Sequence, residues 1–168
     1  MHKVYLGLGS NLGDRHANIE RAVALVNERV GKVIRCSSII ETNPWGFDSE
    51  NRFLNAVLLC ETTLTPRQVL RKTQGIERDL GKRRQHATQR HSSNTIVQSS
   101  KFKVQSSNIK VQSSKFKVQS TEYHDRPIDI DILLYDDLTV DEADLQIPHP
   151  RMQERDFVMI PLQEVMQG

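Results

Sequence analysis

Residues 128–132 read Ile-Asp-Ile-Asp-Ile, a strict alternation of apolar and acidic side chains. An alternation of period two is typical of a β-strand that buries one of its faces. The isoleucines then point into a core, and Asp129 and Asp131 project together from the other face. Two neighbouring carboxylates repel each other unless a cation lies between them, and oxygen ligands suit Mg²⁺. The pair therefore indicates either a magnesium site or an acidic strand that faces solvent and protects a sheet edge.

Hydrophobic periodicity divides the rest of the chain into strands and helices. It predicts strands over 4–8, 33–42, 53–62 and 128–135, and helices over 19–30 and 65–80. Residues 138–140 are expected to pair back onto the last of these strands. A rigid Pro148-His149-Pro150 loop then precedes a short helix that carries Arg155 and Phe157. The order β-α-β-β-α-β predicts an α+β fold, an α/β sandwich in which helices pack on a ferredoxin-like split β-α-β sheet.

Length and composition fit one globular domain, since the chain has 168 residues of which 37% are hydrophobic. No apolar run approaches the roughly 20 residues that span a membrane, and the N-terminus lacks the apolar stretch of a secretory signal. We therefore expect a cytoplasmic protein that does not bind a membrane. Cys36 and Cys60 lie in apolar, strand-like segments and are expected to be buried free thiols, as in a reducing compartment.

Charge is distributed unevenly along the chain. The net charge is only +2, which argues against broad coating of nucleic acid. Basic residues nevertheless crowd 71–90, and acidic residues gather in 125–144. A basic wall facing a carboxylate cluster suits a metal-bound polyphosphate. An ordinary solvated helix face has the same charge pattern, so both interpretations stay open at this stage.

A perfect repeat interrupts the pattern, because from residue 97 the sequence reads VQSSKFK, VQSSNIK, VQSSKFK and VQS. Its apolar residues are spaced by five and two, which excludes a coiled coil. Spacings of two favour a short β ribbon, although paired serines break it. We interpret 92–121 as a low-complexity insert in the single domain, mostly disordered. The alternatives are a β hairpin or a basic tether for nucleic acid or a membrane.

Two further groups of residues are candidates for ligand contact. The glycine-rich segment 7–13 follows the first strand and is either a structural turn or a close approach of backbone to a ligand. Phe53 and Asn55 share one face of a predicted strand. An aromatic ring and an amide can hold a flat heterocycle by stacking and edge hydrogen bonds. The alternative is a core phenylalanine beside a structural asparagine.

Polar residues on and after the second predicted helix suggest a phosphate-binding wall. Gln74 and Glu77 lie three apart and share a helix face, and Lys82 and Arg84 follow the helix end. Glu77 is alternatively the partner of a neighbouring surface arginine. His149, held between two prolines, is either structural or a phosphate ligand.

Taken together, these motifs resemble the 6-hydroxymethyl-7,8-dihydropterin pyrophosphokinase family. The matching motifs span almost the whole chain outside the repeat: Gly9-Ser10-Asn11-Leu12-Gly13, Thr42-x-Pro44-x-Gly46, Phe53-Leu54-Asn55-Ala56, Gln74-x-x-Glu77, Gly81-x-x-Arg84, Arg126-x-x-Asp129-x-Asp131-Ile132-Leu133, Pro148-His149-Pro150 and Arg155-x-Phe157-Val158. The resemblance implies the ferredoxin-like fold already expected. It also implies an ATP-dependent diphosphotransferase of folate biosynthesis, which transfers pyrophosphate from ATP to the hydroxymethyl group of the pterin and releases AMP.

The resemblance implies a role for each matching residue. Asp129 and Asp131 would hold two Mg²⁺ ions that bridge the ATP phosphates, with Arg84 and Arg126 as further catalytic residues. The pterin would contact Thr42, Pro44, Phe53, Asn55, Arg155 and Phe157. ATP would contact Gln74, Glu77, Lys82, Arg84, Arg126, Ile132 and His149. ATP and the pterin would be the only partners of a monomer, without nucleic acid or a membrane.

Three departures from the family pattern bear on these roles. Lys82 stands where the family often has arginine, and Tyr123 stands where it often has tryptophan. The 41 residues of 85–125 separate Arg84 from Arg126, which places the repeat in the loop that closes over ATP in the family. We hypothesise that fold and sites survive while closure of this lid is slowed. The rival functions are a nucleotide- or RNA-binding module without activity, a relative inactivated by the insert, and an ordinary kinase that makes ADP.

Overall fold

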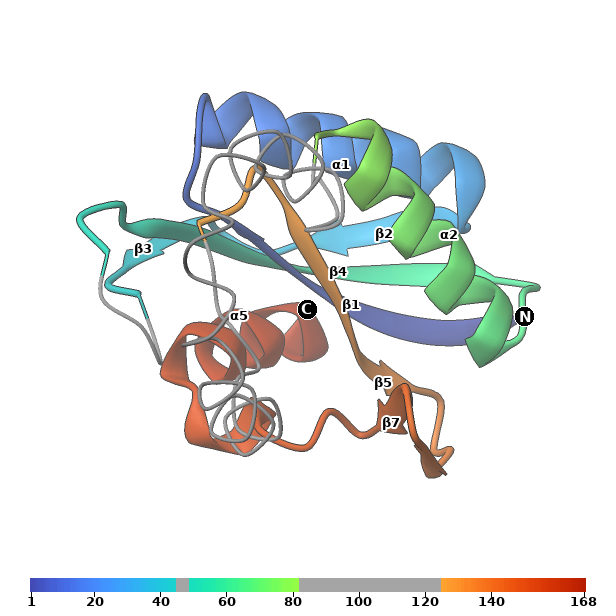
Figure 1. The fold of residues 1–168 in the computed structure, drawn as a ribbon. Coiled ribbons are helices and arrows are strands. Elements are labelled where there is room, and N and C mark those ends of the chain that lie inside the picture. Colours follow the sequence, from blue (N-terminus) through green and yellow to red (C-terminus); the bar gives the residue numbers. More distant parts are fainter. Residues whose placement is uncertain (45–48, 82–124) are drawn as a thin grey trace, which may run out of the picture. The chain divides into compact units, whose positions relative to one another are not determined.

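The computed structural model describes residues 1–44, 49–81 and 125–168 (Figure 1). Their helices and strands follow one another in this order: β1 (His2–Ser10), α1 (Arg15–Arg29), β2 (Lys32–Cys36), β3 (Ile40–Thr42), β4 (Phe53–Thr62), α2 (Pro66–Asp79), β5 (Asp129–Tyr135), β6 (Val140–Glu142), β7 (Leu145–Ile147), the 3₁₀ helix η2 (Met152–Glu154) and α5 (Asp156–Gln167). The predicted repeat at 92–121, with Lys82, Arg84 and Tyr123, lies outside the described residues.

The main sheet is antiparallel and has the strand order β2-β4-β1-β5, with β3 also paired to β4. The predicted α+β class and the split β-α-β arrangement are confirmed. The segment predicted as one strand over 33–42 forms two, β2 and β3, which pair with different parts of β4. β1 is a central strand, so its residues have a neighbour on both sides.

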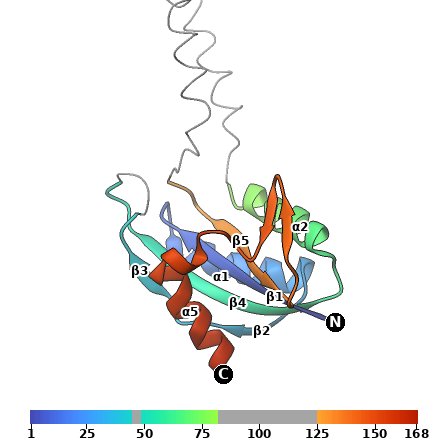
Figure 2. The same cartoon turned by 90° about the horizontal axis from the view of Figure 1, so that it is seen from below.

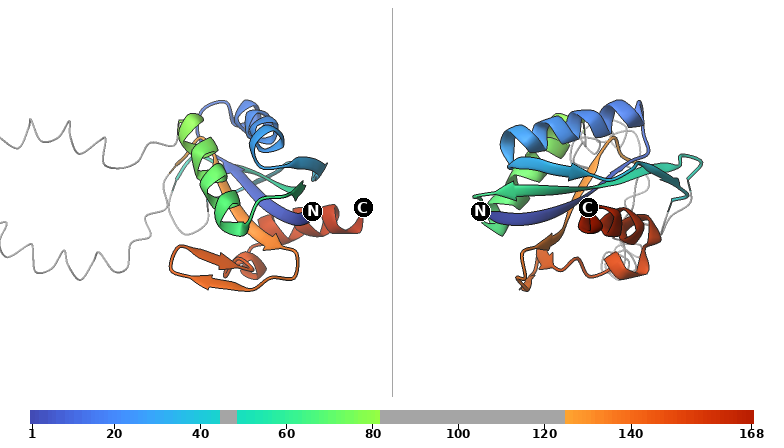
Figure 3. Two further views of the ribbon diagram at one scale, coloured as in Figure 1. Left: turned by 90° about the vertical axis from the view of Figure 1, so that its right-hand side faces the viewer. Right: turned by 180° about the vertical axis from the view of Figure 1, so that it is seen from behind.

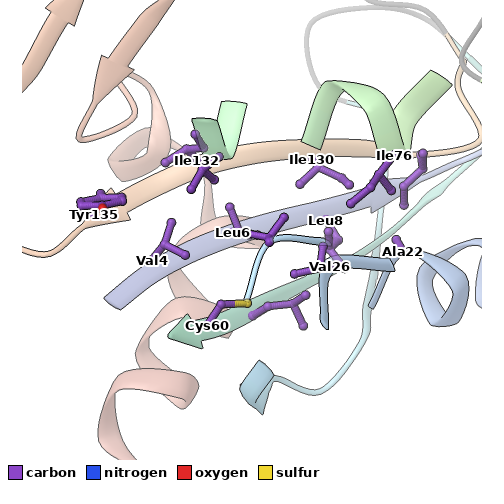
Figure 4. Packing of buried hydrophobic residues seen from close by; sticks show 14 of the residues in the cluster. Val4, Leu6, Leu8, Ala22, Val26, Cys60, Ile76, Ile130, Ile132 and Tyr135 are labelled. Carbon is purple, nitrogen blue, oxygen red and sulfur yellow. The ribbon is translucent and has the colours of Figure 1, made fainter. Parts of the chain in front are cut away.

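Each face of the sheet is covered by different helices. α1 and α2 lie on one face and α5 on the other, as the views from below and from behind also show (Figures 2 and 3). The core between the sheet and α1 and α2 contains alternate residues of three adjacent strands: Val4, Leu6, Leu8, Leu54, Leu58, Cys60, Ile130 and Ile132 (Figure 4). A smaller apolar cluster under α5 includes Val57, Leu59, Leu133, Leu162 and Val165.

Capping residues explain where the two helices of the first layer begin. Thr65 caps α2 and forms a reciprocal capping box with Gln68, and Pro66 occupies the first turn. Asp14 caps α1 by accepting a hydrogen bond from the N–H of Ala17. Gly31 follows the C-cap of α1, and a Cβ at this position would clash with the carbonyl oxygen of Glu61 on β4. The α1–β2 turn therefore requires glycine because the backbones approach closely.

The segment after β5 differs from the prediction. Residues 138–140 do not pair back onto β5; instead β6 pairs with β7 in a separate two-stranded sheet, visible on the left of Figure 3. Arg67 in the first turn of α2 forms ion pairs with Glu142 and Asp144 and so ties this hairpin to the helix. The pairing predicted for 138–140 was wrong, since Val140 pairs with Ile147 of β7 instead.

Two other predictions about local structure need correction. The first strand is longer than the predicted 4–8, since β1 runs from His2 to Ser10, and Gly9 is a strand residue rather than part of a turn. Cys60 is buried as predicted, but Cys36 is exposed because it lies on β2, an edge strand of the sheet. Within the described ranges, no helix combines the length and apolarity that crossing a membrane requires.

Candidate active site

The end of the sheet near Ser10 brings the key sequence motifs onto one face. In the antiparallel register, Gly9 of β1 lies between Asn55 of β4 and Asp129 of β5, and Gly7 lies opposite Asp131. Directly paired residues of antiparallel strands project from the same face. Asn55, Asp129 and Asp131 therefore share the α5 face of the sheet. The two glycines of β1 lie between β4 and β5 and add no side chain to this face.

Asp129 and Asp131 occupy the positions that the alternation predicts. Both are half-buried, whereas Ile130 and Ile132 between and after them are buried against α1 and α2. Their predicted placement on one face is confirmed. In the described part of the chain, no third His, Cys, Asp or Glu joins the pair in a potential metal cage. Two carboxylates with open positions for water and phosphate oxygens fit Mg²⁺, which seldom uses an all-protein cage.

Arg126 connects the acidic pair to the aromatic side of the site. Its Nη1 lies 3.8 Å from Oδ1 of Asp129, and both side chains are about one-fifth exposed, at 19% and 21%. Its guanidinium carbon lies 5.7 Å from the ring centroid of Phe53, within cation–π range. From this position, the planar guanidinium of Arg126 can contact a phosphate oxygen and the edge of a flat ligand at the same time.

Three of the residues predicted to bind the pterin, Thr42, Phe53 and Asn55, lie together on β3 and β4. Phe53 and Asn55 are 7% and 6% exposed, and Nδ2 of Asn55 donates to Oγ1 of Thr42 at 2.8 Å. A Cβ on Gly9 would lie 3.4 Å from Oδ1 of Asn55 and 3.5 Å from Cδ1 of Phe53. The missing side chain thus leaves space in front of the amide and the ring. Pro44, half-buried, follows β3 at the end of the described segment.

α5 brings a second aromatic residue and a second arginine. Arg155 is the N-cap of α5 and is 8% exposed, and its guanidinium carbon lies 5.8 Å from the ring centroid of Phe157. The expected short helix therefore begins one residue after Arg155 and has 12 residues. Arg155 and Arg126 each stack near a phenylalanine, so the site contains two arginine–aromatic pairs.

His149 lies near Asp129 and Arg155. Burial chiefly, with Arg155 and then Arg151, lowers the pKa of His149, although Asp129 opposes this shift. The imidazole is therefore neutral at pH 7. The main-chain N–H of Arg151 donates to Nδ1 of His149 at 3.3 Å, which assigns the ring proton to Nε2. A neutral histidine with Nε2–H as donor can bind a phosphate oxygen.

The residues predicted to line the ATP side are placed in different environments. Gln74 is exposed on α2, whereas Glu77 is 8% exposed and accepts a hydrogen bond from the N–H of Ile130 at 2.8 Å. Glu77 therefore contacts the main chain of β5. Ile132 is 5% exposed in the core under α1 and α2, so its side chain points away from the aspartates and only its main chain can meet ATP there.

Sequence reasoning missed a polar cluster at the entrance to β4 and β5. Asn11 is 2% exposed and bonds to Asp125 and to the main chain of Arg126, while Ser49 and Asn51 also donate to Asp125. The only signal for it in the sequence is Asn11 within the Gly-Ser-Asn motif. The other three members of the cluster, Ser49, Asn51 and Asp125, lie far from Asn11 in the sequence, and no spacing pattern predicts that they meet.

A split β-α-β sandwich with an acidic pair on one sheet face, and with two arginines and a histidine beside that pair, is an arrangement that suits an ATP-using transferase. The chain belongs to the 7,8-dihydro-6-hydroxymethylpterin-pyrophosphokinase family, whose model matches residues 5–98 and 91–167. The family resemblance expected from the motifs is confirmed.

Curated relatives match over almost the whole chain. A 2-amino-4-hydroxy-6-hydroxymethyldihydropteridine pyrophosphokinase of Porphyromonas gingivalis is 42% identical over 163 residues, which cover 96% of this chain and 89% of the relative. Proteins of the same name are 33% identical in Aquifex aeolicus, over 98% of this chain and 81% of the relative, and in Bacillus subtilis, over 97% and 77%.

Solved structures agree on the fold. One described as HPPK-DHPS in complex with substrates superposes with a TM-score of 0.63 at 13% identity. A Plasmodium falciparum HPPK-DHPS triple mutant superposes with a TM-score of 0.60 at 16% identity. This chain is covered to 98% and 97%, and it spans 40% of each of those longer chains.

Proposed function

We propose that this chain transfers the pyrophosphate of ATP to the hydroxymethyl group of 6-hydroxymethyl-7,8-dihydropterin and releases AMP, as a step of folate biosynthesis. The relatives at 33–42% identity that carry the pyrophosphokinase name support this activity. The observation that carries it in the structure is the register that sets Asp129 and Asn55 on either side of Gly9. A single residue of the central strand, Gly9, thus lies between Asp129, which would bind the metal, and Asn55, which would bind the heterocycle.

The two ends of the site would hold the two substrates. Phe53 and Asn55, with Thr42 and Pro44, would bind the pterin on the β3–β4 side, and Phe157 would stack on it from α5. The Asn55 amide already donates to Thr42, so its Oδ1 remains to accept from a ring N–H.

The phosphate side would be lined by cations and neutral donors. Arg126 lies 3.8 Å from Asp129, and His149 is close enough to Asp129 and Arg155 for both to affect its pKa. Gln74, Glu77 and the main chain of Ile132, with Lys82 and Arg84 beyond the described residues, complete the set that we assign to ATP. Glu77 would act here mainly by holding β5 in place, since its Oε1 binds the N–H of Ile130.

Asp129 and Asp131 would hold Mg²⁺, and we propose two ions, which would neutralise charge on the phosphates and align them. The substrate hydroxyl oxygen attacks the β-phosphorus, the bond from the β-phosphorus to the oxygen of AMP breaks, and the hydroxyl proton leaves to solvent. No protein nucleophile takes part. Arg126 and Arg155 keep the triphosphate in line for the attack, so positioning and charge neutralisation supply most of the rate increase.

Incubation of the chain with ATP, Mg²⁺ and the pterin alcohol tests this proposal. AMP and the pterin pyrophosphate are expected as products, separated by anion-exchange chromatography. ADP as the nucleotide product would identify an ordinary kinase, and ATP binding without turnover would identify a nucleotide-binding module or an inactivated relative. The same assay without the pterin controls for hydrolysis of ATP.

We further propose a monomer that acts in the cytoplasm, binds neither nucleic acid nor membranes, and carries the repeat at 92–121 as an insert in a single domain. The family model matches in two stretches that meet within 91–98, and this supports extra residues at that point. Sedimentation of the purified protein tests the monomer.

A further inference from the structure

Asp125, which has no assigned role above, has an unusually complete set of hydrogen bonds for an exposed side chain. Its Oδ1 accepts from Nδ2 of Asn11 and from Oγ of Ser49, both at 2.7 Å, and its Oδ2 accepts from Nδ2 of Asn51 at 2.8 Å. The bonds from Ser49, then Asn51 and Asn11, lower the pKa of Asp125 although burial opposes the shift. An ionised carboxylate thus collects donors from the end of β1 and from the segment before β4.

Asn11 links this carboxylate to the main chain of Arg126. Oδ1 of Asn11 accepts from the N–H of Arg126 at 2.7 Å, and the N–H of Asn11 donates to the carbonyl oxygen of Arg126 at 3.1 Å. Because Oδ1 binds this N–H, the buried amide has to present Nδ2 to Asp125. The carboxylate of Asp125 therefore favours the orientation of the Asn11 amide in which Oδ1 faces the N–H of Arg126. It disfavours the orientation in which Oδ1 and Nδ2 are exchanged.

The main chain of Arg126 sets the direction of a side chain inside the candidate site. The guanidinium lies 3.8 Å from Asp129 and 5.7 Å from the centre of the Phe53 ring. A rotation of the 126 backbone would move the cation relative to both groups. Displacements of about 1 Å in a transfer site can reduce rates by about a hundredfold.

We propose that Asp125 is a positioning residue of the transfer site, which acts through the Asn11 amide to hold the Arg126 guanidinium between Asp129 and Phe53. The consequence for the reaction rests on the proposed function, whereas the placement of Arg126 does not. The competing interpretation is that Asp125 only stabilises the segment of Ser49 and Asn51.

Hydrogen exchange at the backbone amide of Arg126, followed by NMR, tests the placement without reference to activity. Asp125→Ala is expected to accelerate this exchange about tenfold, because the Asn11 amide that accepts the N–H loses its closer and charged orienting partner and keeps only the carbonyl oxygen of Asn51 at 3.4 Å. Asp144→Ala is the matched control, since it removes another exposed carboxylate that accepts hydrogen bonds, in this case from Arg67. Unchanged exchange at Arg126 in Asp125→Ala would overturn the proposal.

Steady-state kinetics of the same variants test the consequence for transfer. Asp125→Ala is expected to raise the KM for MgATP about tenfold with a smaller change in kcat, because a displaced Arg126 binds the triphosphate less well. A purely structural loss would lower the amount of active enzyme and therefore kcat, with KM unchanged. That result would overturn the proposal.

The conservative variant Asp125→Asn separates the hydrogen bond from the charge. Its amide oxygen can still accept from Asn11 and Ser49, so exchange at Arg126 and the KM for MgATP are expected within about threefold of wild type. An asparagine variant as impaired as the alanine variant would show that charge, not the bond to Asn11, matters, and would contradict the proposal. If the wild-type chain makes no AMP, the proposed function fails, and the exchange experiment still decides the placement of Arg126.

Discussion

Glu77 on α2 accepts a hydrogen bond at 2.8 Å from the main-chain N–H of Ile130, the residue between the two aspartates of β5. Among the strands that the structure describes, β5 lies at an edge of the main sheet, and its outer side faces α2 rather than another strand. A carboxylate that is only 8% exposed therefore closes the sheet edge at the position where the acidic pair is presented.

Removing the Glu77 carboxylate is expected to destabilise the fold. Glu77→Ala should lower the free energy of unfolding by about 1–3 kcal/mol, because it leaves the N–H of Ile130 unsatisfied in a buried place. Glu77→Gln keeps an acceptor oxygen and should lose less. Urea denaturation monitored by circular dichroism measures both, and equal losses in the two variants would contradict the role as an acceptor.

Replacing either aspartate of the pair is expected to abolish transfer while the fold survives. Asp129→Ala and Asp131→Ala should each reduce kcat by more than about a hundredfold, since each would remove a proposed ligand of the Mg²⁺ at the phosphates. The two side chains are half-buried like charges, but Asp129 also lies 3.8 Å from Arg126, so the melting temperature should change little. Asp137→Ala, in the exposed turn after β5, is the control. Substantial AMP production by either variant would remove the metal assignment.

The space in front of Gly9 is expected to determine pterin binding. Gly9→Val should raise the KM for the pterin about tenfold or more, because its γ-methyl groups would enter the space beside Asn55 and Phe53. Gly9→Ala adds a Cβ in ordinary contact with both side chains and serves as the milder control. The KM for MgATP should change little. An equal rise for both substrates would indicate a general distortion of β1 instead.

The two cysteines are expected to differ in reactivity. Burial raises the pKa of Cys60 to about 12, so its thiol stays protonated and shielded at pH 8. Cys36 is exposed, although burial and the nearby Glu164 raise the pKa of its thiol as well. One thiol per native chain should react with an aromatic disulfide reagent, more slowly than free cysteine. Cys36→Ser should remove this reaction, and two equivalent thiols would contradict the assignment.

Deletion of residues 97–119 tests the proposed insert. The deletion should leave the melting temperature within about 2 °C, because we propose that the repeat is an insert outside the domain core. Turnover should rise if the repeat slows closure over ATP. An unchanged or lower rate would count against this hypothesis.

Local pattern was sufficient where one segment contains its own signal. The alternation at 128–132 predicted both the strand and the shared face of Asp129 and Asp131. Thr65 and Pro66 likewise predicted the start of α2. In both cases burial of one face, or capping of one turn, depends on residues that are neighbours in the sequence.

Features that depend on distant partners were not predictable in the same way. Gly7 and Gly9 look like turn residues until β4 and β5 are seen to pair with β1 on both sides. The exposure of Cys36 follows from the edge position of β2, which only the strand order reveals. The bond from Ile130 to Glu77 likewise requires α2 to lie against the outer edge of β5.

The pairing of β1 with β5 has a consequence for how the chain reaches its native state. A slip of one residue in this pairing would turn Asp129 and Asp131 toward Val26 and Ile76 and expose the isoleucines to water. Burial of two unpaired carboxylates costs several kcal/mol, so such a misaligned intermediate would not accumulate. The charges of Asp129 and Asp131 therefore also disfavour a misaligned pairing of β5 with β1.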